Sequence, residues 1–119
     1  MQTLRQDAQA IIDKALADAL PDSAVRRALE QFQKPEGRLV LIAAGKAAWQ
    51  MAKAAYDVLG TAITGGAVIT KYGHVKGPIG ALELFEAGHP VPDENSYRAT
   101  SRALELVSGL TGRDTVLFL

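Results

Sequence analysis

Apolar residues recur at helical spacing through the first part of the chain. Residues 3–20 carry an apolar position every three or four residues, which predicts an amphipathic helix. Residues 21–23, Pro-Asp-Ser, break this pattern and offer a cap for a second helix. The apolar stripe of the first helix comprises Leu4, Ala8, Ile11, Ile12, Ala15, Leu16 and Leu20, and that of the second comprises Val25, Leu29 and Phe32.

Beyond residue 37 the pattern alternates between strands and helices. Residues 38–45, "RLVLIAAG", form a nearly continuous apolar run, which is typical of a parallel strand buried on both faces. Residues 46–59 have a helical pattern with an alanine-rich face that can lie close to a sheet. We expect the remaining elements to be strands at 66–72, 81–88 and 115–119 and a helix from residue 92 to about residue 110.

This order of elements predicts an α/β fold, a layered Rossmann-like domain with a mostly parallel sheet flanked by helices. We expect residues 1–119 to form a single domain, with the two leading helices over one face of the sheet. The last predicted strand is apolar and includes Leu119, so we also expect the chain to be the first part of a longer protein. In open parallel sheets, ligands bind beyond the carboxyl ends of the strands, so candidate site residues are sought there.

Composition narrows the class of protein. The 119 residues contain 13 basic and 13 acidic side chains and are 48% hydrophobic, which indicates a globular domain without a nucleic-acid or membrane partner. The absence of cysteine excludes disulfides and thiolate metal sites. No signal peptide is apparent, and no apolar run reaches the roughly 18 to 20 residues that span a bilayer. A cytoplasmic location is therefore expected.

The first candidate site residues are Gly45 and Lys46, where the first strand meets its helix. We expect Lys46 in the first helical turn, where a cation is unfavourable unless an anion also binds. The plain alternative is a solvated lysine at the head of a polar stripe. The segment lacks the upstream glycine and the Ser/Thr of a P-loop, and it also lacks the G-x-G-x-x-G pattern of dinucleotide-binding folds.

Lys71 and His74 follow the second predicted strand in "TKYGH". A lysine at this position can offset the charge of a phosphate, and a histidine can transfer a proton or donate a hydrogen bond. The alternative is a basic pair that faces water.

The segment "EAGHPVPDENS" gives the third candidate, His89. Gly88, Pro90 and Pro92 constrain the backbone around this histidine, and Asp93 can cap the following helix. The alternative role of His89 is structural, with the imidazole bonded to nearby backbone. Two histidines without a third ligand match no common zinc pattern, so no metal ligand is assigned.

Three segments, "LIAAGKAAWQMAKAA", "GAVITKYGH" and "EAGHPVPDENSYRAT", together resemble the ATP-dependent glycerate 2-kinases of the tartrate-utilisation type, which are often labelled hydroxypyruvate reductases. The final "TGRDTVLFL" is similar to the strand that leads into the glycine- and serine-rich phosphate loop of that family. The resemblance covers almost the whole chain and is weakest in the two leading helices.

The resemblance implies a two-domain kinase that transfers the γ-phosphoryl group of ATP to D-glycerate with a divalent cation such as Mg²⁺. This chain would be the front of its larger N-terminal domain. Lys46, Lys71, His74 and His89 match positions that face the cleft of that family, with Gly45 and the two lysines binding substrate or phosphate. Because the phosphate loop and the second domain are not part of the sequence, we expect the chain alone to be inactive. A homodimer remains an option.

Two other functions remain open at this point. The first is an NAD(P)H-dependent hydroxypyruvate reductase, against which the missing dinucleotide fingerprint argues. The second is a non-catalytic sugar-phosphate-binding module, since a strand, a tight turn and an alanine-rich helix also build such domains.

Overall fold

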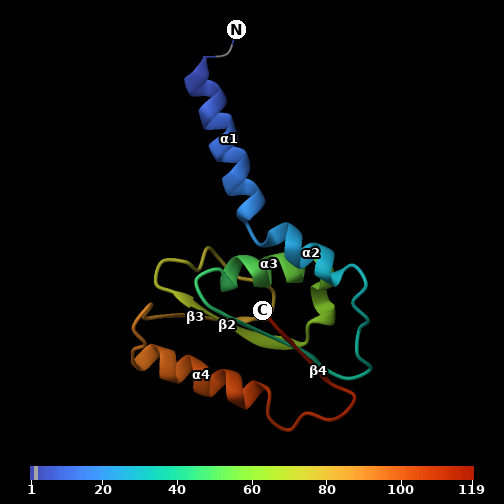
Figure 1. Cartoon of the computed structure of the whole chain (residues 1–119). Helices are drawn as coiled ribbons and strands as arrows, with labels where there is room; N and C mark the ends of the chain where they lie inside the picture. The colour runs from blue at the N-terminus through green and yellow to red at the C-terminus, as the bar shows by residue number, and fades with distance from the viewer. Residues whose placement is uncertain (2) are drawn as a thin grey trace.

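The computed structural model describes Met1 and residues 3–119. The elements follow one another as α1 (Leu4–Ala19), α2 (Asp22–Leu29), β1 (Leu39–Ala44), α3 (Ala48–Leu59), the short 3₁₀ helix η1 (Gly60–Ala62), β2 (Gly65–Lys71), β3 (Glu83–Ala87), α4 (Glu94–Leu106) and β4 (Thr115–Phe118) (Figure 1). In the described part of the chain, no helix is both long enough and apolar enough to cross a membrane.

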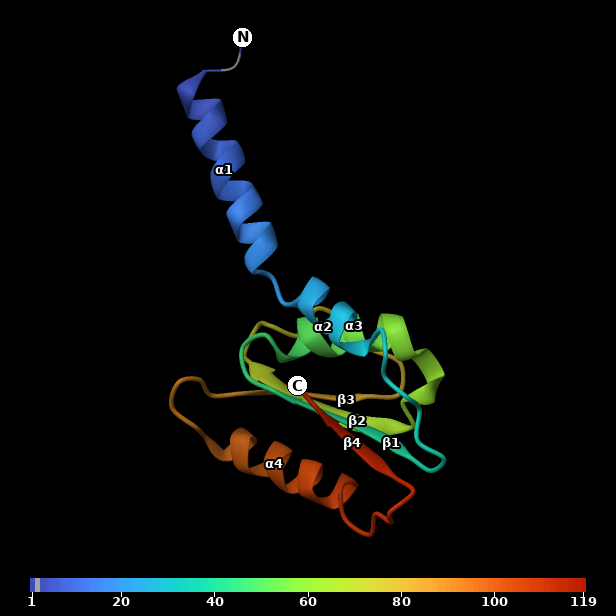
Figure 2. The ribbon, with the colours of Figure 1, turned by 45° about the vertical axis from the view of Figure 1, so that its right-hand side comes forward.

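The strands form a single four-stranded sheet in the order β3-β2-β1-β4, and every neighbouring pair is parallel. Helices α2 and α3 cover one face, and α4 covers the other (Figures 1 and 2). The predicted α/β fold with a parallel sheet flanked by helices is therefore confirmed.

The core lies in two layers, one on each face of the sheet. On the α3 face, the alanine side chains of α3 are almost fully buried against β1 and β2, as the alanine-rich pattern predicts. Gly66 allows β2 to approach β1, because a Cβ there would lie 1.9 Å from the Leu41 carbonyl oxygen and its φ is +153°. Val40, Ile42, Ala67 and Ala103 form the smaller core layer under α4.

Helix α1 departs from the prediction. It begins with a capping box between Thr3 and Gln6, yet none of its residues is buried. Figures 1 and 2 show it projecting away from the sheet, so it does not cover a face; only α2 does, by packing on α3. The helix predicted from the apolar stripe is confirmed, but the stripe alone does not identify the surface that the helix contacts. Helix α4 also ends at Leu106, earlier than the predicted Leu110.

Candidate functional site

The carboxyl ends of β1, β2 and β3 meet at one edge of the sheet, because the three strands are parallel neighbours. This edge carries the turn at residues 45–47, the loop at residues 71–74 and the loop at residues 88–93. The structure therefore brings all three predicted site segments to the same edge.

The turn after β1 is held by backbone hydrogen bonds and by a glycine. Gly45 has φ of +125°, a conformation that L side chains rarely adopt, although a Cβ there would meet no atom within 4 Å. Its amide donates to the Ile69 carbonyl over 3.0 Å, and its carbonyl accepts from the Ala48 amide over 3.1 Å. The requirement for glycine thus comes from the shape of the turn and not from crowding.

Lys46 lies in this turn and not in the first turn of α3, which corrects the prediction. Its carbonyl oxygen accepts hydrogen bonds from the Thr70 hydroxyl at 3.4 Å and from the His74 ring at 3.0 Å. Because these groups hold the Lys46 carbonyl toward the end of β2, it is not directed into the helical hydrogen-bond ladder. The helix accordingly begins two residues later.

The His74 ring is therefore already hydrogen-bonded to the backbone of this chain. A carbonyl oxygen only accepts, so Nδ1 of His74 must carry the proton of this bond. In the neutral ring, Nε2 then has a lone pair that can accept a hydrogen bond. His74 secures the Lys46 turn and keeps one ring nitrogen for another partner.

His89 is placed differently. Its side chain is exposed and makes no hydrogen bond to the residues that the structure describes, so the alternative of an imidazole bonded to nearby backbone does not apply. It lines a small cavity of about 110 Å³ together with Gly45 and Lys71. The side chains of Lys46 and His74 do not line this cavity. The remaining lining residues are Ala44, Ile69, Thr70, Ala87, Gly88 and Ser96.

The loop that carries His89 is closed at its base by Asp93. The Asp93 carboxylate caps α4 by accepting from the Ser96 amide over 3.1 Å. It also accepts from the Tyr72 hydroxyl over 2.6 Å, and Asn95 donates to the same hydroxyl over 2.8 Å. The Tyr72 hydroxyl and the backbone of Gly88 lower the pKa of Asp93 to about 2, and the bond to Asp93 raises the pKa of Tyr72.

Sequence reasoning found the capping role of Asp93 but missed Tyr72. The only signal for Tyr72 in the sequence is its position next to Lys71. The link from Tyr72 to Asp93 joins the loop after β2 to the loop after β3, and so fixes both walls of the cavity.

The charged groups at this edge of the sheet favour the binding of an anion. Lys46 and Lys71 form no ion pair with the residues described, whereas Glu86 accepts from the Val75 amide over 3.2 Å and Asp93 accepts from Tyr72. The backbone amides of Lys46 and Ala47 also donate no hydrogen bond within the described residues. Two ammonium groups and two amides are thus available to a negatively charged ligand.

Trp49 and Tyr56 are partly buried against the core and do not line the cavity. The Trp49 indole donates to the Gly77 carbonyl over 2.9 Å, which ties the long connection between β2 and β3 to α3. In Met1 and residues 3–119, no three side chains of His, Cys, Asp or Glu are grouped so that they could hold a metal ion.

Comparison with known proteins identifies the family of this chain. Residues 7–119 match the family described as a domain of unknown function, DUF4147. The chain belongs to the DUF4147 family. A D-glycerate 2-kinase from Thermotoga maritima is 52% identical over 118 residues, covering 99% of this chain and 28% of that protein. A relative from Agrobacterium vitis with the provisional name hydroxypyruvate reductase is 41% identical over 115 residues, covering 97% of this chain and 26% of the relative.

Solved structures give the same relationship for this DUF4147 chain. The glycerate kinase of Thermotoga maritima has a TM-score of 0.82 at 51% identity, covering 93% of this chain and 26% of that chain. A protein from Pyrococcus horikoshii has a TM-score of 0.80 at 29% identity, covering 99% of this chain and 29% of that chain. The predicted relationship to the glycerate 2-kinases is confirmed. The chain spans about a quarter of the length of these relatives.

Proposed function

We propose that this chain is the first part of an ATP-dependent glycerate 2-kinase that phosphorylates D-glycerate. The parent protein is the full-length product of the gene that encodes the chain. The observation that carries the proposal is the 52% identity to a D-glycerate 2-kinase over 99% of the chain. The grouping of Lys71 and His89 around one cavity supports it, because a small anionic substrate needs a cation and a hydrogen-bonding group close together.

Each residue at the strand ends has a proposed role. Lys71 offsets the negative charge of the glycerate carboxylate or of a phosphate, and Lys46 does the same with the free amides of its turn. His89 accepts a hydrogen bond from the hydroxyl of glycerate and orients it for transfer. His74 positions Lys46 through the bond to its carbonyl and is not assigned a direct contact with substrate.

ATP, when bound, supplies the phosphoryl group, and a divalent cation offsets the charge of its phosphates. The two lysines and the free amides fit a phosphate-bearing or carboxylate-bearing ligand. The described residues offer no cluster of three metal ligands, so we assign no Mg²⁺ ligand to this chain. The chemistry assigned here is charge neutralisation and orientation of the acceptor hydroxyl.

A second candidate is a hydroxypyruvate reductase, because the relative from Agrobacterium vitis carries that provisional name. The turn after β1 reads Gly45-Lys46-Ala47, without the further glycines through which dinucleotide folds approach a pyrophosphate. An assay of the parent protein with ATP and D-glycerate, and then with NADH or NADPH and hydroxypyruvate, distinguishes the two. Turnover only with the second pair would overturn the kinase proposal.

Replacement of His89 by alanine in the parent protein tests the site. We expect kcat/KM for D-glycerate to fall by roughly 10²-fold or more, as for the loss of an acid–base or orienting group. The melting temperature should not change, because the His89 side chain is exposed and unbonded within the described residues.

The control for this experiment is Val91→Ala. Val91 lies on the same loop, is 75% exposed and does not line the cavity. Its kinetics should match those of the unmodified parent protein. Unchanged turnover in His89→Ala would remove His89 from the site, and equal losses in both variants would indicate a general effect on the loop.

A further inference from the structure

The carboxyl end of β2 carries the buried hydroxyl group of Thr70. Thr70 is 3% exposed, and it is the only buried polar side chain in the part of the chain that the structure describes. It lines the cavity of about 110 Å³ together with Lys71 and His89. Since a buried polar group requires a hydrogen-bond partner, the partner of this hydroxyl indicates its role.

Within the described residues, the Thr70 hydroxyl has a weak partner. It donates to the Lys46 carbonyl over 3.4 Å, which is longer than the roughly 2.5 to 3.0 Å of an ordinary O–H···O bond. The same carbonyl accepts a shorter bond, over 3.0 Å, from the His74 ring. His74 can therefore hold the turn at residues 45–47 when the Thr70 hydroxyl bonds to another acceptor.

The position of Thr70 suits contact with a ligand. Its hydroxyl is directed toward the turn at residues 45–47, and Gly45 of that turn also lines the cavity. The Thr70 backbone belongs to β2 and lies opposite Glu86 of β3, so the side chain comes from a paired strand and not from a loop. Branching at Cβ restricts its rotamers, whereas the hydroxyl hydrogen can rotate toward a new acceptor.

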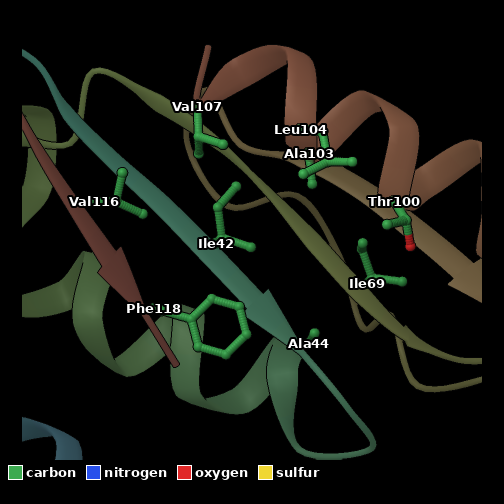
Figure 3. A pocket seen from close by; sticks show the side chains of 9 residues that line it. All are labelled: Ile42, Ala44, Ile69, Thr100, Ala103, Leu104, Val107, Val116 and Phe118. Atoms are coloured by element: carbon green, nitrogen blue, oxygen red, sulfur yellow. The ribbon is translucent and has the colours of Figure 1, made fainter. Parts of the chain in front are cut away.

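The groups around this hydroxyl favour a small anion as the ligand. Lys71 supplies a positive charge to the cavity, and His89 supplies a ring that can form a hydrogen bond. The larger cavity between β4 and α4, of about 400 Å³, differs because Thr100 is its only polar lining residue (Figure 3). An anionic oxygen in the small cavity is a better acceptor than the Lys46 carbonyl, because hydrogen bonds to charged groups are shorter and stronger.

We propose that Thr70 contacts the ligand of this cavity, and that its hydroxyl turns from the Lys46 carbonyl to an oxygen of the bound anion. That oxygen belongs to a carboxylate or to a phosphate group, which offer the same acceptor chemistry. This role rests on the proposed kinase function, because it concerns the ligand of the same cavity. It adds a donor on a strand to the contacts proposed for Lys71 and His89.

The test uses three single variants of the parent protein. Thr70→Val replaces the hydroxyl by a methyl group and keeps the branched shape, Thr70→Ser keeps the hydroxyl, and Thr64→Val is the matched control. The Thr64 hydroxyl also donates to a backbone carbonyl, that of Leu39 over 3.0 Å, but Thr64 precedes β2 and does not line the cavity. Isothermal titration calorimetry with D-glycerate and with inorganic phosphate measures the dissociation constants, and thermal unfolding measures stability.

Thr70→Val should weaken the binding of at least one of the two anions by roughly 10-fold or more, as for the loss of a hydrogen bond to a charged group. A loss for D-glycerate alone assigns the contact to the substrate, and a loss for phosphate alone assigns it to a phosphate group. Thr70→Ser and Thr64→Val should retain the unmodified dissociation constants. The melting temperature of Thr70→Val should not change, because His74 continues to hold the Lys46 carbonyl.

Two results would overturn this role of Thr70. The first is the same binding of both anions in Thr70→Val as in the unmodified parent protein, including the absence of binding in both. The second is an equal loss of affinity in Thr70→Ser, because the methyl group and not the hydroxyl would then be responsible. Failure of the kinase function gives a different result, in which the unmodified parent protein binds an anion but forms no ADP from ATP and D-glycerate.

Discussion

The two histidines of the site differ in their contact with the backbone carbonyl of Lys46. His74 donates a hydrogen bond to it, whereas His89 lies on an exposed loop and lines the cavity. Both histidines follow parallel strands, so the sequence pattern alone does not distinguish their roles. This difference is the basis for the proposed positioning role of His74 and the proposed substrate contact of His89.

At the amino edge of the sheet, Asp114 provides a pH-dependent contribution to stability. Its side chain is only 6% exposed, and the amides of Thr111 and Arg38 donate to it over 2.8 and 2.6 Å. These hydrogen bonds lower the pKa of Asp114 to about 2. Because the folded pKa lies below the ordinary value of 3.8, the stabilisation is present above pH 4 and is lost as the pH falls toward 2.

We therefore expect Asp114→Asn to lower the urea midpoint of this chain at pH 6 and to flatten its decline between pH 4 and pH 2. The check is urea unfolding at a series of pH values. Asp93→Asn removes a second carboxyl whose pKa is about 2, at the opposite edge of the sheet. The two effects should add, because distant sites with no shared partner behave independently. Identical pH slopes in Asp114→Asn and the unmodified chain would contradict the assignment.

Three of the predicted site residues line the cavity, but the contacts within the site were not predicted from the sequence. Gly45, Lys71 and His89 could be predicted because strand ends and loop residues are readable from pattern, and parallel strands end at one edge. The bond from Tyr72 to Asp93 could not, because it joins residues 21 positions apart whose approach depends on the packing of α4.

At the scale of elements, α1 should be dispensable for the folding of the rest of this chain. It has no buried residue, and Ile11 and Leu16 are 70% and 63% exposed. An isolated helix of this length is marginal in water, since most helical stability in proteins comes from tertiary packing. Deletion of residues 1–20 should therefore reduce the helical circular dichroism signal without lowering the melting temperature of the remainder.

The measurement is thermal unfolding followed by near-ultraviolet circular dichroism, with Val25→Ala as the control. Val25 is 5% exposed in the core between α2 and α3, so its truncation should lower the melting temperature. A loss of cooperative unfolding on deletion of α1 would mean that the helix packs against the sheet in solution.

The four strands were predictable because a parallel sheet buried on both faces requires continuous apolar runs. All four predicted strands occur, with bounds that differ by a few residues. Helix ends were less predictable, because they depend on local hydrogen bonds. Helix α4 ends at Leu106, and the Ser108 hydroxyl just beyond it donates to the Glu105 carbonyl over 2.7 Å. The apolar spacing that extends to Leu110 does not encode that contact.

At the scale of the whole molecule, the proposed kinase function requires groups from both this chain and the remainder of the parent protein. Under this proposal, the chain supplies one wall of the substrate cleft, with Lys71 and His89 at the ends of parallel strands. It contains no group of three metal ligands in its described part. Phosphoryl transfer depends mainly on positioning and charge neutralisation around the nucleotide, which one wall cannot provide.

The 119-residue chain should accordingly release no ADP from ATP and D-glycerate, while the parent protein should turn over under the same conditions. A coupled assay of ADP formation measures both. Adding the separately expressed remainder of the parent protein to this chain should restore part of the activity, and the His89→Ala chain should restore less than the unmodified chain. Turnover by the chain alone at the rate of the parent protein would contradict the division, because it would place the whole catalytic site within these residues.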